Sequence, residues 1–289
     1  MVSLSVKEFL FWKKKQLSKG GDQSSFAVLL DCVGGITNSD LNLKSINPRG
    51  NIHLKKNLEF LESIWDDHLI KSCPIQYLCG KTFWRDLKLK VTNKVLIPRP
   101  ETELIVDIVF NIFQKKSEKL FFAELGTGSG AISIALALAY PLSKVVATDI
   151  EQDALEIANK NFINSSKQSN LKFYCGNWWS PLENFKGKFD LVISNPPYIP
   201  RDTYEKLPKE VKNFEPKVAL LGGEDGLDHL REIIQKAPLY LKNNGWLILE
   251  NHFDQSEKVK QLLIKNKFAS IEILKDLSGI GRFTIARYK

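Results

Sequence analysis

Four consecutive residues, Asn195-Pro-Pro-Tyr198, follow the apolar run Phe189–Ser194 and could act on a weakly nucleophilic nitrogen. The NH2 group of an amide or an aminopurine has a delocalised lone pair, so it must be oriented and the positive charge developing on it must be stabilised. Two acceptors aimed at its two N–H groups would do both. The side-chain oxygen of Asn195 and the main-chain carbonyl of Pro196 are suited to this, because the two prolines restrict the backbone. Tyr198 can then cover the flat face of the target, although a strand-ending turn without chemistry is the alternative interpretation.

A glycine-rich loop lies upstream of this segment. The apolar run Leu120–Leu125 predicts a strand, and Gly126-Thr-Gly-Ser-Gly130 separates it from a predicted helix over residues 131–139. Strand, glycine loop and helix in this order are typical of nucleotide-type sites, because glycines let a ligand approach the backbone closely. The spacing Gly-x-Gly-x-Gly differs from the dinucleotide fingerprint Gly-x-Gly-x-x-Gly.

A second predicted strand, over residues 144–149, ends in the carboxylate of Asp149. A carboxylate at this place can accept hydrogen bonds from ribose hydroxyls, although Asp149 could instead cap the helix expected near Gln152. The ordered series of Glu124, the glycines, Asp149 and Asn195 indicates a site for S-adenosylmethionine.

With these motifs the chain resembles class I S-adenosylmethionine-dependent methyltransferases, and more narrowly the HemK/PrmC family of release factor glutamine N5-methyltransferases. The narrower resemblance rests on Pro74–Leu78 with Gly80, on Ile97-Pro-Arg-Pro-Glu-Thr-Glu103 and on further segments up to Arg282. Two positions depart from the family's pattern. Asn177 stands where an acidic residue often precedes the tryptophan, and Glu250-Asn-His252 replaces a commoner Glu-His-Gly.

The resemblance implies roles for individual residues. The glycine loop would wrap the methionine part of the cofactor, Asp149 would bind its ribose and Trp178 would flank its adenine. The residues implied to bind the cofactor are Glu124, Gly126, Thr127, Gly128, Ser129, Gly130, Asp149, Trp178 and Asn195. The residues implied to contact the substrate glutamine are Arg99, Glu101, Asn195, Pro196, Pro197 and Tyr198, and the last four are also the predicted catalytic residues. Arg99 has two open roles, positioning the substrate backbone or pairing with a carboxylate.

The elements that position these residues are expected to form two domains. Residues 1–80 carry amphipathic helical patterns without strand alternation and predict a helical bundle that docks the protein substrate, with a capping box at Ser5 and Glu8. Breaks are expected at Gly20-Gly21, Gly34-Gly35 and residues 47–50. Residues 81–98 predict a linking β-hairpin around Asn93-Lys94.

Residues 99–289 alternate strand and helix. This pattern predicts an α/β domain with a mostly parallel sheet and a terminal antiparallel hairpin, which the resemblance makes a seven-stranded Rossmann-like methyltransferase domain. Later strands are expected at 171–175, 189–194, 245–250, 268–274 and 282–288. A helix over residues 227–243 should kink or break at Pro238 and end at Asn244-Gly245.

Composition restricts partners and location. The formal charge of +8 is spread along the chain, and Lys13-Lys14-Lys15 most simply forms a solvated helix face, so we do not expect direct binding to nucleic acid. The four cysteines contain no Cys-x-x-Cys pair, so no metal site or disulfide framework is predicted. Without a signal-peptide pattern or a membrane-spanning stretch, a cytoplasmic location is expected. The sequence does not encode the oligomeric state, for which a monomer is the default expectation.

The expected reaction is direct in-line transfer of a sulfonium methyl group to a glutamine side-chain nitrogen of peptide chain release factors. No covalent enzyme intermediate or evident general base is needed, and structural roles are favoured for Glu101, Glu103 and Glu124. The main competing hypothesis is an N6-adenine methyltransferase of RNA or DNA, because an exocyclic NH2 needs the same acceptors. Glutamine methylation of a ribosomal protein and a catalytically idle binding module are also compatible with these motifs.

Overall fold

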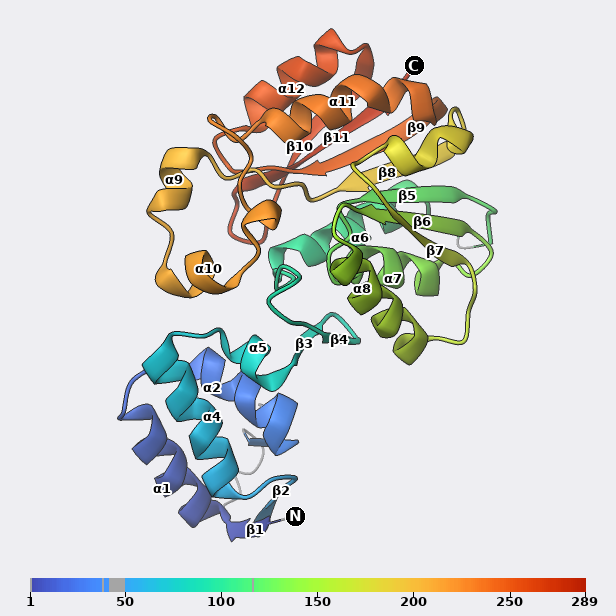
Figure 1. Ribbon diagram of the computed structural model, residues 1–289. Helices are drawn as coiled ribbons and strands as arrows, with labels where there is room; N and C mark the ends of the chain where they lie inside the picture. Colours follow the sequence, from blue (N-terminus) through green and yellow to red (C-terminus); the bar gives the residue numbers. More distant parts are fainter. Residues whose placement is uncertain (1, 38, 42–49, 116) are drawn as a thin grey trace. The chain divides into compact units, whose positions relative to one another are not determined.

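The computed structural model describes residues 2–37, 39–41, 50–115 and 117–289, which divide into two compact units (Figure 1). The helical unit comprises Met1–Thr82, Val91–Asn93 and Pro208–Phe214. The sheet unit comprises Phe83–Lys90, Lys94–Leu207 and Glu215–Lys289.

The core of the helical unit is rich in aromatic residues. Its described helices are α1 (Val6–Leu17), α2 (Gln23–Leu29), η1 (Leu30–Gly34), α4 (Leu58–Lys71), α5 (Ile75–Cys79) and, from the distant segment, α10 (Lys209–Phe214). Phe26 packs edge-on against Trp65, with ring centroids 4.9 Å apart. The predicted capping box is confirmed, because the amide of Glu8 donates to the Ser5 hydroxyl and the amide of Ser5 donates to the Glu8 carboxylate.

The prediction that this part of the chain lacks strands is wrong. Strand β1 (Val2–Ser5) pairs antiparallel with β2 (Asn51–Leu54). In β2 the buried Ile52 and Leu54 alternate with exposed neighbours, an alternation too short to stand out in the sequence. Of the break predicted at residues 47–50, only Gly50 is among the described residues.

The hairpin predicted around Asn93-Lys94 forms at a different turn. Strands β3 (Lys81–Trp84) and β4 (Leu87–Lys90) make a two-stranded sheet and are joined by Arg85 and Asp86. Arg85 takes a positive φ of 49°, which is the conformation a tight turn requires. Its guanidinium is held by both carboxylate oxygens of Asp107, at 2.9 and 3.0 Å, and these contacts between distant residues fix the turn.

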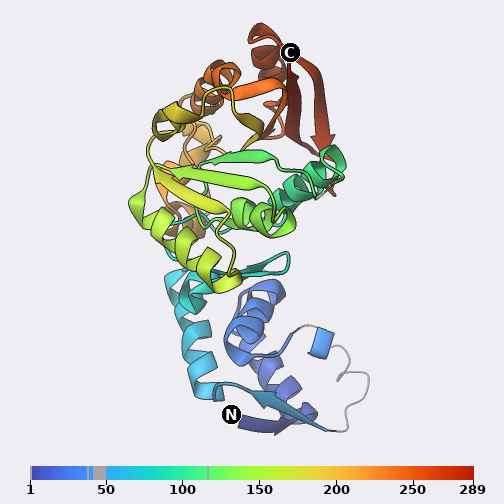
Figure 2. The same cartoon turned by 90° about the vertical axis from the view of Figure 1, so that its right-hand side faces the viewer.

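The sheet unit is built on one seven-stranded sheet in the order β10-β11-β9-β8-β5-β6-β7 (Figure 2). Its strands are β5 (Phe121–Leu125), β6 (Lys144–Asp149), β7 (Leu171–Cys175), β8 (Phe189–Ser194), β9 (Leu241–Glu250), β10 (Phe268–Lys275) and β11 (Gly281–Tyr288). Strands β5 to β9 pair in parallel, whereas β11 is antiparallel to both β9 and β10. The predicted fold class is confirmed.

Helices cover both faces of this sheet (Figures 1 and 2). On one face lie α6 (Leu104–Ile112), α7 (Ala131–Ala139) and α8 (Gln152–Ser165), which share a hydrophobic core with alternate residues of β5, β6 and β8. On the other face lie η3 (Ser180–Phe185), α11 (Asp228–Tyr240) and α12 (Ser256–Lys265). They pack on the strand residues that alternate with those of the first core. Burial on both faces explains why these strands read as continuous apolar runs.

The expected end of α11 is wrong. The helix continues through Pro238 to Tyr240, and β9 begins at Leu241. Pro238 stands in the last turn, and the helix ends two residues after it. Asn244, with a φ of 65°, and Gly245 lie inside β9, where the register with β8 shifts between Phe189 and Leu191. The Asn-Gly pair therefore forms a strand irregularity instead of ending a helix.

Three shorter helices complete the sheet unit. They are η2 (Glu101–Glu103), α9 (Arg201–Glu205) and η4 (Lys217–Ala219). Among the residues that the structure describes, no helix has the length and apolar character needed to cross a bilayer.

Candidate active site

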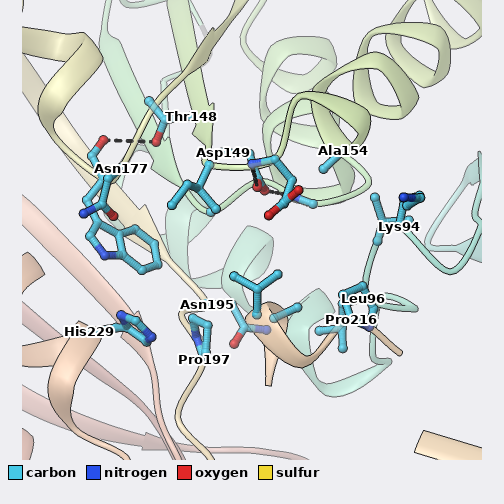
Figure 3. Close-up of a pocket in the computed structure, with 18 of the residues that line it drawn as sticks. Lys94, Leu96, Thr148, Asp149, Ala154, Asn177, Asn195, Pro197, Pro216 and His229 are labelled. Carbon is cyan, nitrogen blue, oxygen red and sulfur yellow. Dashed lines mark hydrogen bonds between the residues drawn. The ribbon is translucent and has the colours of Figure 1, made fainter. Parts of the chain in front are cut away.

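A pocket with an empty volume of about 750 Å³, part of it open to solvent, lies at the carboxyl ends of β5, β6 and β8 (Figure 3). Ligands of open α/β sheets bind at this edge. The predicted site residues that line the pocket are Gly126, Gly128, Asp149, Trp178, Asn195 and Pro197.

The glycine loop forms one wall. Gly126, Gly128 and Gly130 have φ values of 75°, 54° and 84°, which only glycine adopts readily. At Gly128 an added Cβ would meet open space, so the backbone itself faces the pocket. At Gly130 it would lie 3.0 Å from the Cβ of Ala158 in α8, so this glycine allows close packing of loop and helix.

Glu124 lies beneath the loop and does not line the pocket. Its side chain is 3% exposed, and its Oε2 atom accepts hydrogen bonds from the Thr127 hydroxyl at 2.6 Å and the Ser133 amide at 2.9 Å. Burial raises the pKa of Glu124 to about 7, against the lowering effect of these bonds. Ser129 is also buried, and its carbonyl accepts from Asn161. Glu124, Thr127 and Ser129 therefore support the shape of the loop.

Asp149 joins the loop to the next strand. Its Oδ2 accepts from the amide of Gly128 at 2.8 Å, and its Oδ1 accepts from the amide of Glu151 at 3.0 Å. Burial raises the pKa of Asp149, an effect that these backbone bonds oppose. The N-cap residue of α8 is Glu151, so Asp149 does not occupy the capping position suggested as its alternative role. Figure 3 shows Asp149 on the pocket wall across from Asn195.

Trp178 supplies a flat apolar wall. Its backbone has a positive φ of 43°, and its carbonyl accepts a hydrogen bond from the Thr148 hydroxyl at 3.2 Å. The indole packs against the ring of His229, with centroids 5.4 Å apart. An added Cβ on Gly126 would lie 3.1 Å from this indole, which gives a second reason for glycine at that position.

Asn195 follows β8 next to β9 and is held by Thr102, which is distant in sequence and is itself bonded to Glu250. Its Nδ2 donates to the Thr102 hydroxyl at 3.3 Å, and that hydroxyl donates to Oε2 of Glu250 at 2.8 Å. The Tyr198 hydroxyl donates to the other oxygen of Glu250 at 3.4 Å. Both ends of the Asn195–Tyr198 segment thus connect to one buried carboxylate.

Comparison with known proteins agrees with this geometry. The model of the family described as "Methyltransferase domain" matches residues 116–278. The release factor glutamine methyltransferase of Prochlorococcus marinus is 42% identical over 98% of this chain and 97% of its own length. The chain belongs to the release factor glutamine methyltransferase family.

A second relative supports this assignment, and one solved structure shares the fold. The release factor glutamine methyltransferase of Synechocystis sp. is 37% identical over 98% of this chain and 97% of the relative. A crystal structure of a methyltransferase from Pyrococcus furiosus has a TM-score of 0.51 and 20% identity, covering 71% of this chain and 90% of that one, and it shares the fold.

Arg99 and Glu101 of this methyltransferase lie outside the pocket lining. The Arg99 guanidinium contacts both oxygens of the buried Glu215 at 2.8 Å, so of its two predicted roles the structure contains the pairing with a carboxylate. Glu101 is exposed at the start of η2. Of the Asn195–Tyr198 segment, Asn195 and Pro197 line the pocket, whereas Pro196 and Tyr198 are not among the lining residues.

Sequence reasoning missed several residues of the candidate site. Thr102 has no signal of its own inside the Ile97–Glu103 segment, and Glu250 stands out only as part of a variant motif. Leu96 and His229 line the pocket without a motif of their own. The register of β8 with β9, Ser194 opposite Leu249, is the one signal that would have placed Glu250 beside Asn195. His252, whose role the sequence left open, pairs with Asp254 at 2.6 Å.

Proposed function

We propose that this chain transfers a methyl group from S-adenosylmethionine to the side-chain nitrogen, N5, of the glutamine in the Gly-Gly-Gln loop of peptide chain release factors. The observation that carries the proposal is that Asn195 and Pro197 line the same pocket as the glycine loop and Asp149, in a chain of this family. Asn195, one of the two acceptors of the proposed amide clamp, thus lines the same cavity as the residues of the proposed nucleoside site.

The pocket residues suit S-adenosylmethionine. Gly128 offers bare backbone to open space, as the amino-acid part of the cofactor requires. Asp149 accepts from two backbone amides and has further lone pairs for ribose hydroxyls. Trp178, Ile150 and Ala154 provide apolar surface for the adenine ring. We propose that Glu124, Thr127, Ser129 and Gly130 act indirectly, by holding the loop in this shape.

S-adenosylmethionine supplies a methyl group bonded to a positively charged sulfur. The chain's own contribution is to position the acceptor amide and to stabilise charge. The Asn195 side-chain oxygen and the Pro196 carbonyl accept hydrogen bonds from the two N–H groups of the glutamine amide. These bonds orient the amide nitrogen. Both acceptors gain strength as positive charge develops on that nitrogen, so they bind the transition state better than the ground state. The extra proton leaves after transfer, because an N-alkylated amide cation is strongly acidic.

Arg99 and Glu101 keep a proposed part in substrate contact. Arg99 is held by Glu215 with about a third of its side chain exposed, so its remaining N–H donors are available to a peptide backbone. Docking of the release factor on the helical unit, a cytoplasmic location and a monomeric state remain predictions.

The proposal is tested by incubating the protein with cofactor labelled in its methyl group and with purified release factors, total RNA or ribosomal proteins. We expect label that survives nuclease, is lost on protease treatment and maps to the glutamine of the Gly-Gly-Gln loop. A release factor with alanine in place of that glutamine is the control and should remain unlabelled. Label that nuclease removes would favour an adenine methyltransferase, and label confined to ribosomal proteins would favour glutamine methylation of a ribosomal protein. Absence of transfer to every substrate would refute the proposal.

A further inference from the structure

Glu250 occupies a place in the site to which the proposed reaction assigns no role. It ends β9, and the parallel pairing of β8 and β9 brings it beside Asn195. Its side chain is 2% exposed, and that of Thr102 is 4% exposed. A carboxylate in such surroundings is retained only with good hydrogen-bond partners, and here two hydroxyls provide them.

While Glu250 is ionised, the hydrogen-bond inventory fixes the direction of each bond in this cluster. An ionised carboxylate only accepts, so Thr102 must use its single hydroxyl proton on Glu250. The oxygen of Thr102 then has only lone pairs to offer to Asn195. The group of Asn195 that faces Thr102 must therefore be the NH2 group, which is the arrangement at 3.3 Å.

We infer that Thr102 and Glu250 are positioning residues that set the orientation of the Asn195 amide, so that its oxygen and not its NH2 group faces the methyl-accepting nitrogen. The inference rests on the proposed function. A rotated Asn195 amide would present N–H groups to the N–H groups of the substrate, and the clamp would repel the amide that it should hold. Tyr198, bonded to the other oxygen of Glu250, is held by the same carboxylate.

The protonation state of Glu250 decides whether this ordering holds. Burial raises the pKa of Glu250 to about 7, although the Thr102 hydroxyl and the positive charge of Arg282 lower it, and Glu101 raises it further. When Glu250 is protonated, it can donate to Thr102, and Thr102 can then donate to the oxygen of Asn195. The productive orientation is therefore enforced above a pH of about 7 and lost as the pH falls through it.

The first experiment compares three variants in single-turnover methyl transfer to a release factor. Thr102→Val removes the hydroxyl at nearly constant volume, and we expect its transfer rate to fall about 10- to 100-fold with unchanged cofactor affinity. Thr102→Ser retains the hydroxyl and should restore a rate close to wild type. Thr284→Val is the matched control, because Thr284 is a buried threonine whose hydroxyl donates to Asn251 at 2.8 Å, outside the cluster. Equal rates for Thr102→Val and Thr284→Val, or a Thr102→Ser variant as slow as Thr102→Val, would overturn the inference.

A second measurement needs no substrate, so it separates this inference from the proposed function. The side-chain NH2 protons of Asn195 should be protected from exchange with water in the wild type and in Thr102→Ser, and unprotected in Thr102→Val, as read by NMR of the labelled amide. Protection that is the same in all three proteins would refute the inference even if the enzyme methylates release factors. Protection as expected in an enzyme that labels no release factor would refute only the proposed function.

The pH profile tests the role of Glu250. The wild-type transfer rate should fall below pH 7 with the titration of one group, whereas Glu250→Gln, which cannot titrate, should show a flat profile between pH 6 and 8 at whatever rate it retains. Glu124, whose pKa also lies near 7, remains in that variant. An acid limb that persists in Glu250→Gln therefore belongs to another group and contradicts the inference.

Discussion

The two halves of the active site each rest on a buried glutamate, but the two glutamates are held differently. Glu124 beneath the glycine loop accepts from Thr127 and Ser133, which are three and nine residues away. Glu250 beneath the Asn195–Tyr198 segment accepts from Thr102, which is 148 residues away, and from Tyr198, which is 52 away. The buried glutamate of the loop half is thus held within one strand–loop–helix segment, whereas that of the amide half is held only once β8, β9 and the segment that contains Thr102 have come together.

This difference separates the expected functions of the two halves. Residues of the loop half surround the proposed cofactor site, so changes there should alter cofactor affinity. Residues of the amide half face the proposed substrate amide, so changes there should alter the rate of transfer. Two substitutions test this separation, and a third tests the titration of the buried glutamate beneath the loop.

The largest effect is expected for Asn195→Ala. It removes one of two acceptors that act on developing charge, so turnover should fall about 10²- to 10³-fold while the cofactor dissociation constant changes little. Single-turnover kinetics and calorimetry measure the two quantities. Asn170→Ala is the control, because the Asn170 amide donates to three carbonyls, those of Ala137, Tyr140 and Ser143, and precedes β7 away from the active-site edge. Near-normal turnover of Asn195→Ala would refute the amide clamp.

Asp149→Ala should have the next largest effect, and this effect should be on the cofactor dissociation constant instead of on turnover. Loss of a carboxylate that accepts from Gly128 and is placed for ribose hydroxyls should raise the cofactor dissociation constant about 10²-fold, because hydrogen bonds to charged groups contribute about 1.5–3 kcal/mol each. The rate at saturating cofactor should change far less. Asp190→Ala provides the comparison. Asp190 also accepts a hydrogen bond from a backbone amide, that of Phe121 at 2.8 Å, but it lies outside the pocket lining. Unchanged affinity in calorimetry would show that Asp149 has no ribose role.

The smallest effect is expected for Glu124→Gln and concerns stability. Because the pKa of Glu124 is about 7 when folded and near 4.5 when unfolded, the folded state binds its proton more tightly. Its contribution to stability is therefore present below pH 4.5 and lost as the pH rises through 7. Glutamine does not titrate, so the free energy of unfolding of Glu124→Gln relative to wild type should rise by about 2 kcal/mol between pH 5 and pH 8.

Denaturant unfolding at several pH values measures this difference. Glu8→Gln is the control, because the Ser5 hydroxyl and amide hold the pKa of Glu8 below its ordinary value. Its difference from wild type should therefore be constant over the same range. A constant difference for Glu124→Gln as well would mean that Glu124 titrates as it does in the unfolded chain.

The same contrast explains what could be predicted from the sequence. The strand at 144–149, the helix at 131–139 and the glycine loop between strand and helix depend on local patterns, and the structure has them where they were expected. The Thr102–Glu250 contact depends on the register of β8 and β9, which no local pattern encodes. Asn244-Gly245 misled for a related reason, because an Asn-Gly pair has the same local preference in a turn and in a strand irregularity. The turn at Arg85 is fixed by Asp107, and only the folded structure brings these two residues together.

The indole of Trp178 gives the protein a built-in optical probe. It forms part of the pocket wall, touches His229 and stands against Gly126 in the loop. A ligand that fills the pocket must displace water from this ring, so the fluorescence emission of Trp178 should change with occupancy. Titrations followed by that emission would report on binding without any label, and Trp178→Phe would identify the part of the signal that comes from this one residue.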